Sequence, residues 1–474
     1  MSFFHSLLSG SQKPTHFISS TGSDANDGLT EDTPWQTLAK VNASTFAPGD
    51  RIGFKKGDTW REVMTIHDSG TAGNPIVYTG YGTGAIPRIM NSLDCSGLTW
   101  TVHSGSIYKA TKTGMPAICN AGWLDTNTLL IKAATLVALD AAGEFFNDNA
   151  ANTLYVWLPD STSPQGKTIE LSKSASTVLQ IQKNYITIDG IRIGHGGGVF
   201  CVLAYNFGVG SNNNNIVNCE IGPSWKDGIL IGVNTGTIKS NYVHDCWNGL
   251  EYPSQVGAGI SSVNDVNTDL DISSNLVERC AGGIRLGGPH QGTIVAKNTV
   301  LHNHVNGIDV QGGVNGFTTS VLNNTVWHKP TGTAGHGIDI QLGTAGHGLI
   351  SKNNIVYSDF EGVGGLNVQM MCIDNTTYTG TDVNNNCYFS TPAYTGALGK
   401  LGVTEYDTLA EFQTALNSTT YSGKEASSIN DDPLFTDDVN DDYTLQGGSP
   451  CINAGVDVGL PFNGVAPDMG AYEV

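Results

Sequence analysis

The sequence predicts an all-β fold, a single-stranded parallel β-helix in which the chain winds as a solenoid. A motif of glycine, an aliphatic residue and a third, usually polar residue recurs five times, and a sixth copy precedes it at 228–232. The five copies begin at Gly249, Gly283, Gly307, Gly337 and Gly365. An Asn-x-aliphatic element stands ahead of each copy, beginning at Asn241, Asn275, Asn298, Asn324 and Asn354. Their spacings of 34, 23, 26 and 30 residues are typical of single solenoid turns with loops of unequal length.

The amino-terminal part predicts a cap for this solenoid. Residues 1–14 are expected to form a tail, and residues 15–94 the cap and the first coils. A short helix is predicted over 33–40, with Thr33 as its cap and Pro34 at its first position. Such a helix would cover the apolar core and the strand edges that a terminal coil exposes.

The rest of the chain is expected to hold three further parts. Residues 95–172 interrupt the repeat and predict an antiparallel β insertion, since short alternating segments are separated there by turns. Residues 173–390 are expected to form the regular coils and the groove of an active site. Residues 391–474 predict a carboxy-terminal cap, with a short helix over 410–416.

Composition narrows the range of possible functions. A net charge of −20 argues against nucleic-acid binding, because phosphates require a basic face. No window is apolar enough for a membrane span. The 60 glycines and a charged fraction of 14 % are typical of short strands and tight turns. The nine cysteines show no zinc-type spacing and are expected to be buried free thiols.

Side chains alternate along a strand, so the centre of each glycine motif is expected on one outer face of the solenoid. If the coils are in register, Asp309 and Asp339 lie about 5 Å apart, which suits the acid and the nucleophile of a retaining glycosidase. Arg285 would orient a sugar or hold a carboxylate ionised. The predicted column consists of Glu251, Arg285, Asp309, Asp339 and Asn367.

A second column is predicted behind the Asn-x-aliphatic elements. Histidines on consecutive coils would supply a general base, with His302 as the catalytic candidate, or imidazole ligands for a metal. The predicted substrate-binding residues in and around the two columns are His244, Asp245, Arg279, His304, Gln311, His328, His336, Gln341 and Asn367. A structural interpretation stays open for both columns, because coils repeat and solubility alone requires polar outer residues.

The loop with Asp24 and Asp27 is a candidate calcium site, since hard cations take carboxylate and carbonyl oxygens. Its spacing is not that of an EF-hand, and a solvated acidic turn explains it equally well. No cofactor is required by the predicted chemistry, and Ca²⁺ is the one cation that the pattern suggests.

Both ends of the chain resemble a known superfamily. Residues 16–60, which include Ser-Asp-Ala-Asn-Asp-Gly and Thr-Pro-Trp-Gln-Thr-Leu, resemble the opening of pectate-lyase-like right-handed parallel β-helix proteins. Residues 432–435, 448–455 and 468–473 are similar to the ending of these proteins. The resemblance implies a right-handed parallel β-helix. It also implies a place in a superfamily that holds polysaccharide lyases, glycoside hydrolases, epimerases and phage tailspike depolymerases. It supplies no motif for one reaction.

Three functions follow as expectations. The first is an enzyme that cleaves a linear glycan along the β-helix face by glycosidase-type acid–base chemistry. The second is a calcium-assisted polysaccharide lyase, in which Arg285 and a histidine would act on a uronate. The third is a non-catalytic glycan-binding or structural spike. The start lacks a convincing signal peptide, so we expect either that a signal was removed before the numbering begins or that the protein leaves its cell in another way, such as in a virus particle released by lysis. The expected location is therefore extracellular or virion-associated, and the expected association is a homotrimer or virion assembly.

Overall fold

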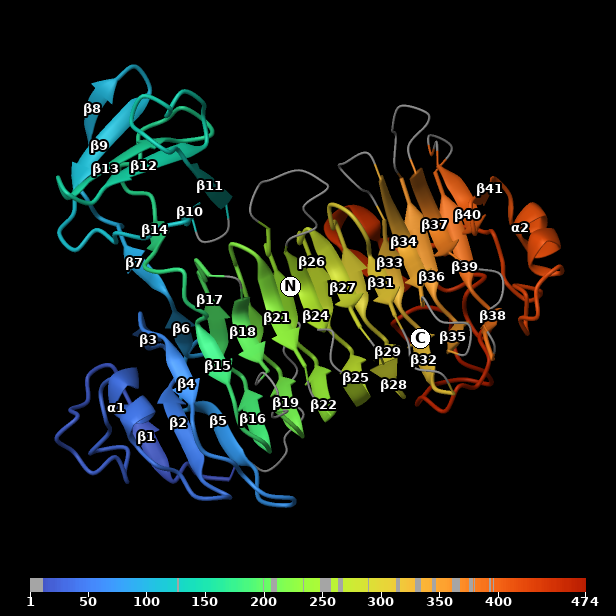
Figure 1. Ribbon diagram of the computed structural model, residues 1–474, viewed down its shortest axis with the longest axis horizontal. Helices are drawn as coiled ribbons and strands as arrows, with labels where there is room; N and C mark the ends of the chain where they lie inside the picture. Colours follow the sequence, from blue (N-terminus) through green and yellow to red (C-terminus); the bar gives the residue numbers. More distant parts are fainter. Residues whose placement is uncertain are drawn as a thin grey trace. The chain divides into compact units, whose positions relative to one another are not determined.

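The computed structural model describes residues 12–125, 128–198, 200–205, 211–232, 234–247, 257–262, 267–288, 290–312, 316–328, 334–342, 347–359, 367–374, 378, 380–391, 394 and 396–474. The chain divides into two compact units. The first comprises Met1–Tyr205, Asn218–Leu230 and His244–Leu250, and the second Asn206–Val217, Ile231–Val243 and Glu251–Val474. Each unit is built mainly from three parallel sheets, as a parallel β-helix requires (Figure 1).

The first unit holds the opening coils. In order of pairing, its first sheet contains β1 (His16–Ile18), β2 (Arg51–Lys55), β5 (Ile76–Tyr81) and β16 (Ile186–Asp189). Its second sheet contains β3 (Thr59–Trp60), β6 (Arg88–Met90), β17 (Arg192–Gly194) and β20 (Glu220–Ile221). Its third sheet contains β4 (Met64–Ile66), β15 (Leu179–Ile181), β18 (Phe200–Ala204) and β21 (Asp227–Ile231).

The predicted insertion is confirmed as a separate eight-stranded sheet within this unit (Figure 1). All its pairs are antiparallel except the pair β11–β12. Phe145, Leu154 and Leu171 are fully buried in its own apolar core. In order of pairing, its strands are β7 (Ser92–Asp94), β14 (Ile169–Ser172), β10 (Ala121–Leu124), β11 (Thr128–Lys132), β12 (Glu144–Asp148), β13 (Thr153–Trp157), β9 (Ile107–Thr111) and β8 (Thr101–Ser104).

The second unit repeats the three-sheet plan, and β23 (Tyr242–His244) falls at the division between the units. Its first sheet contains β19 (Asn214–Val217), β22 (Asn234–Lys239), β25 (Asn267–Ser273), β29 (Ile294–Ala296), β32 (Thr318–Leu322), β35 (Gly348–Lys352) and β38 (Asp382–Asn384), with β28 (His290–Gln291) beside β25. Its second contains β26 (Leu276–Glu278), β30 (Thr299–Leu301), β33 (Thr325–Trp327), β36 (Ile355–Ser358) and β39 (Cys387–Ser390).

The third sheet of this unit carries the glycine motifs. It contains β24 (Ala258–Ser262), β27 (Gly282–Leu286), β31 (Ile308–Gln311), β34 (Ala334–Gln341), β37 (Asn367–Ile373) and β40 (Ala397–Leu401), with β41 (Thr404–Tyr406) antiparallel at its end. The carboxy-terminal cap adds the hairpin of β42 (Phe435–Asp437) and β43 (Asp442–Leu445), and the 3₁₀ turn η1 (Asp438–Asn440).

The amino-terminal helix begins later than the sequence predicts. It is α1 (Leu38–Ala43), capped by Thr37, and the expected start at Thr33 is wrong. Trp35 instead pairs with the first strand, because its amide donates to the carbonyl of Phe17. The carboxylate of Asp24 accepts the amide of Thr37 over 3.0 Å and holds the chain extended up to that residue.

The second helix, α2 (Leu409–Leu416), confirms the prediction and has a capping box between Thr408 and Glu411. Neither α-helix among the described residues has the length and apolar character to cross a membrane. All nine cysteines are buried and free, as expected.

The asparagines that mark each coil form a buried ladder in the second unit. The side-chain oxygen of each asparagine accepts the backbone and side-chain nitrogens of the asparagine one coil earlier, all at 3.0 Å. The side-chain nitrogen also donates to a backbone carbonyl. The ladder pairs each of Asn241, Asn275, Asn298, Asn324 and Asn354 with the next, and ends at Asn386. It stabilises the turn that precedes every strand of the second sheet.

Candidate functional site

The outer face of the third sheet in the second unit carries a continuous polar column. On β31 the side chains of Ile308 and Val310 are fully buried, and Asp309 between them points to the opposite face. The paired strands place one residue of each coil opposite the next. The column runs through Ser261, Arg285, Asp309, Asp339, Cys372 and Lys400.

One member of the predicted column is corrected, and another, Glu251, lies outside the described residues. Among the described residues, Ser261 lies opposite Arg285 on the preceding coil. Asn367 begins β37 opposite Ala334, so it is not in register with Asp339. Cys372 takes that position because Met371 and Ile373 on either side of it fill the core. The described residues of the glycine motif at 365–369 pair with residues 334–336, and not with the motif at 337–341.

The prediction that Asp309 and Asp339 are direct neighbours is confirmed. Their exposed fractions are only 3 % and 1 %, although they lie on the outer face. Gln311 Nε2 donates to Asp309 Oδ2, and Gln341 Nε2 donates to Asp339 Oδ2, each over 2.7 Å. The other oxygen, Oδ1, of each aspartate is buried and accepts no hydrogen bond from the described residues. Such atoms are rare in native proteins, and an ordered water, a bound ion, strain or a catalytic role accounts for them.

The surroundings of Asp309 favour the protonated form of its carboxyl group. Burial, and next the negative charge of Asp339, raise the pKa of Asp309 to about 8. Two carboxylates on adjacent coils cannot both ionise without strong repulsion, so one proton is retained. Arg285 opposes this effect only in part, since its Nε lies 3.7 Å from Asp309 Oδ2 and its Nη2 donates to Gln311 over 3.2 Å.

Three further groups surround Asp339. Asn306 Nδ2 donates to Asp339 Oδ2 over 3.3 Å, and Asn306 Oδ1 accepts the amide of His336. His336 Nε2 lies 3.9 Å from Asp339 Oδ2. Burial lowers the pKa of His336, and burial together with the charge of Asp339 raises the pKa of Cys372 above its usual range. A neutral imidazole and a protonated thiol therefore flank the carboxylate.

A small cavity opens beside Asp309. It is lined by Ala258, Ala281, Gly282, Gly283, Ile284, Arg285, Val305, Asn306 and Asp309. Small apolar side chains form most of the wall, while Arg285, Asn306 and Asp309 supply polar groups. A pocket with a few convergent polar groups and a perturbed carboxyl is a usual form of binding site.

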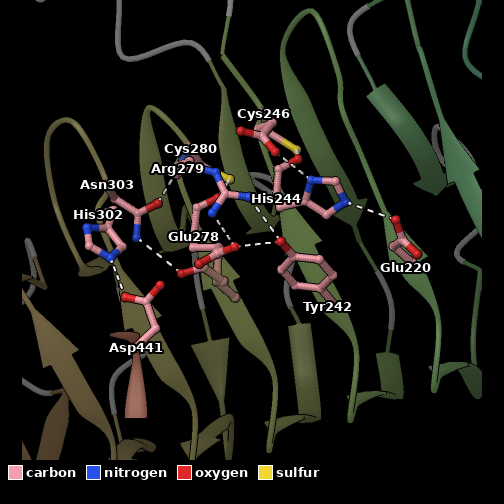
Figure 2. A network of polar contacts seen from close by, with 12 residues as sticks. Glu220, Tyr242, His244, Cys246, Glu278, Arg279, Cys280, His302, Asn303 and Asp441 are labelled. Atoms are coloured by element: carbon pink, nitrogen blue, oxygen red, sulfur yellow. Dashed lines mark hydrogen bonds and ion pairs between the residues drawn. The ribbon is translucent and has the colours of Figure 1, made fainter. Parts of the chain in front are cut away.

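The predicted second column does not join this site. In the second unit, Arg279 and Tyr242 bond to Glu278 (Figure 2). His302 Nε2 lies 2.8 Å from Asp441 Oδ1 (Figure 2). The ring of His302 also packs on the ring of Trp327. These residues follow the second sheet, so His302 is engaged by the carboxy-terminal cap instead of the aspartate pair.

The remaining predicted residues have separate surroundings. In the first unit, His244 Nε2 lies 3.4 Å from Glu220 Oε1 (Figure 2). His244 Nδ1 lies 2.6 Å from Asp245 Oδ2, and these two acids raise the pKa of His244 against the effect of burial. His328 is buried, with its Nε2 3.0 Å from the carbonyl of Gly335. His304 is half-buried, and burial lowers its pKa.

The aspartates of the candidate calcium loop are engaged by the chain itself. Asp24 accepts bonds from the amides of Gln36 and Thr37 and from the Thr37 hydroxyl, which lowers the pKa of Asp24 despite some burial. Asp27 accepts the hydroxyl of Thr33 over 2.7 Å. These bonds explain both residues as parts of a folded turn.

No family model matches this chain. Over 193 residues it is 31 % identical to lacto-N-biosidase of Bifidobacterium longum subsp. longum, a match that covers 38 % of this chain and 11 % of that protein. The chain thus spans only about a tenth of that relative. It is 25 % identical over 480 residues to the uncharacterized protein YwoF of Bacillus subtilis, with 92 % of this chain and 91 % of the relative covered.

Solved structures show the same architecture. XylC in complex with xylose matches with a TM-score of 0.56 and 13 % identity over 81 % of this chain and 86 % of that one. A glycoside hydrolase matches with a TM-score of 0.50 and 13 % identity over 83 % of this chain and 97 % of that one. The stacked parallel sheets show that the chain has a parallel β-helix fold, and these two matches support the same architecture.

Proposed function

We propose that this chain hydrolyses glycosidic bonds in a polysaccharide, with Asp309 and Asp339 as the reacting carboxyl pair. The observation that carries the proposal is the buried pair on adjacent coils, each aspartate held by its own glutamine and each with one oxygen left over. Folding alone gives no reason to bury two such carboxyls side by side.

The spacing of the pair and the raised pKa of Asp309 support two different roles. Neighbouring strands lie about 4.8 Å apart, which is close to the separation of roughly 5 to 5.5 Å in retaining glycosidases. Asp339 is then the nucleophile. Asp309 protonates the leaving oxygen, and its pKa of about 8 supports this role because it keeps the proton at neutral pH. Arg285 and Gln311 beside Asp309 are suited to sugar hydroxyls.

The relatives support a glycan substrate. Lacto-N-biosidase, XylC with xylose and a glycoside hydrolase are proteins named for carbohydrate chemistry, and each shares sequence or fold with this chain. An outer face of a β-helix is also an extended surface that suits a linear polymer. Extracellular or virion-associated location and polysaccharide as the partner remain part of this proposal.

The test is a panel of neutral and acidic polysaccharides incubated with the full chain and with the double variant Asp309→Asn/Asp339→Asn. Hydrolysis releases reducing ends without unsaturated, ultraviolet-absorbing products, and the double variant should release none. Unsaturated products would show elimination instead. Unchanged cleavage by the double variant would remove the pair from the mechanism, and no cleavage of any glycan would favour a binding or structural spike.

A further inference from the structure

A second kind of chemistry lies on the far side of Asp339 from Asp309. His336 and Asp339 are on β34, and Cys372 lies opposite Asp339 on β37. One potential ligand atom from each of these three residues lies within 4.8 Å of the other two. They are a nitrogen, an oxygen and a sulfur, a donor set that differs from the all-oxygen sites of calcium and magnesium.

The spacing is close to that of a tetrahedral metal site. Zinc binds sulfur at about 2.3 Å and nitrogen or oxygen at about 2.1 Å, which puts neighbouring ligand atoms roughly 3.4 to 3.8 Å apart. His336 Nε2 and Asp339 Oδ2 are already 3.9 Å apart. The other separations are at most 4.8 Å, so they need to shorten by no more than about 1 Å, which rotation of side chains on two paired strands supplies.

Unsatisfied buried atoms point independently to a ligand here. Asp339 Oδ1 and His336 Nδ1 are buried and find no hydrogen-bond partner among the described residues, and Asp339 is only 1 % exposed. Gln369, which lies opposite His336 on β37, is fully buried, and its Oε1 also lacks a hydrogen-bond partner among the described residues. A metal ion would bind a carboxylate oxygen directly, and a water on the ion would donate to Gln369.

We propose that His336, Asp339 and Cys372 bind a borderline-soft divalent ion, of which Zn²⁺ is the best match, with a water in the fourth position. On binding, the thiol of Cys372 forms a sulfur–metal bond and its proton passes to solvent, so one proton is released for each ion bound. Asp339 belongs to both this site and the proposed hydrolytic pair. The ion and the glycan reaction therefore compete for the same carboxylate.

The experiment titrates the full chain with Co²⁺, which substitutes for Zn²⁺ and gives an absorption band when a thiolate is its ligand. We expect one Co²⁺ per chain, a sulfur-to-cobalt band, and displacement by Zn²⁺. Cys372→Ser should lose the band and bind at least about tenfold more weakly. The matched control is Cys280→Ser, which changes another buried thiol of the same unit and should keep the band.

Two results would overturn the proposal. One is wild-type protein that gives no sulfur-to-cobalt band at one equivalent of ion. The other is a band that persists in Cys372→Ser with a circular dichroism spectrum like that of the wild type. If Cys372→Ser fails to fold, His336→Gln provides the same test through a weaker Co²⁺ affinity. Because the readout is the bound ion, failure here leaves the hydrolysis proposal standing, and loss of hydrolysis leaves this one standing.

Discussion

Two stacks of polar side chains run through the second unit, and they differ in how completely they are bonded. In the asparagine ladder, every amide from Asn241 to Asn354 bonds to its neighbour and to a backbone carbonyl. In the aspartate column, Asp309 and Asp339 are equally buried, yet each keeps an oxygen that no described residue serves.

This difference separates a structural repeat from a site. A buried polar group contributes to stability only when its partners are present, and an incomplete set costs roughly 1 to 3 kcal/mol for each unsatisfied atom. In the asparagine ladder, other residues of the chain supply these hydrogen-bond partners. In the column, Asp309 Oδ1 and Asp339 Oδ1 lack such partners among the described residues, which supports the proposal that a ligand binds there. Repetition in the sequence alone does not make this distinction, because both stacks repeat once per coil.

The largest effect is expected for Asp339→Asn. Replacing the nucleophile should lower glycan cleavage by about 1000-fold or more, which corresponds to roughly 4 kcal/mol in the barrier. The control is Asp271→Asn, which makes the same change on β25 in another sheet of the same unit. Cleavage rates at saturating glycan compare the two. Equal rates in both variants would place the chemistry elsewhere.

The next effect concerns the ladder. Asn298→Ala should lower the free energy of unfolding by about 4 kcal/mol, because Asn275 loses an acceptor and Asn324 and Ile272 lose donors. The folded fraction should still cleave at the wild-type rate. Urea unfolding measures the change, and the exposed Asn463→Ala serves as the control. A loss below about 1 kcal/mol would show that the ladder is not what secures the coils.

A smaller effect is expected where the ladder ends. Asn386 donates to Glu425, a fully buried carboxyl that Tyr388 Oη also reaches over 2.6 Å. Burial raises the pKa of Glu425 to about 7. The folded state therefore keeps a proton that the unfolded chain releases near pH 4.5, and the stability gained from it is complete at low pH and lost as the pH rises through 7.

Glu425→Gln should remove this dependence. Between pH 5 and pH 8, the wild type should lose about 2 kcal/mol more of its unfolding free energy than the variant does. Urea unfolding of both proteins at the two pH values measures the difference. Parallel pH profiles would mean that Glu425 is ionised in the fold throughout this range.

Much of the fold was predictable from the sequence, because coil spacing and alternation report directly on packing. The insertion and α2 appear where expected, and the glycine motifs at 283–287, 307–311 and 337–341 pair in register in one sheet. The start of α1 was not, since Pro34 favours a helix locally but the pairing of Trp35 with the first strand prevails. In the sequence, the asparagines of the ladder indicated only that each coil repeats. Their hydrogen bonds were not predicted, because these join residues more than 20 positions apart.

The site was predictable in part. Asp309, Asp339 and Arg285 were found through a shared register, and the structure confirms their pairing. Ser261 and Cys372 were missed, because loops of unequal length shift where a coil re-enters the sheet. The buried alternation of Met371 and Ile373 was the signal that would have found Cys372. The histidines share an offset in sequence, but corners of the coil turn them toward different partners.

The most direct test of the comparison is the free energy of unfolding of Asp309→Asn/Asp339→Asn, measured in urea beside its glycan cleavage. If the column is built for a ligand and the ladder for the fold, this variant should be at least as stable as the wild type, since it removes buried negative charge while an asparagine Oδ1 can still accept from Gln311 and from Gln341, and should cleave nothing. A loss of about 3 kcal/mol or more with cleavage intact would contradict the account, because the column would then be a second structural ladder.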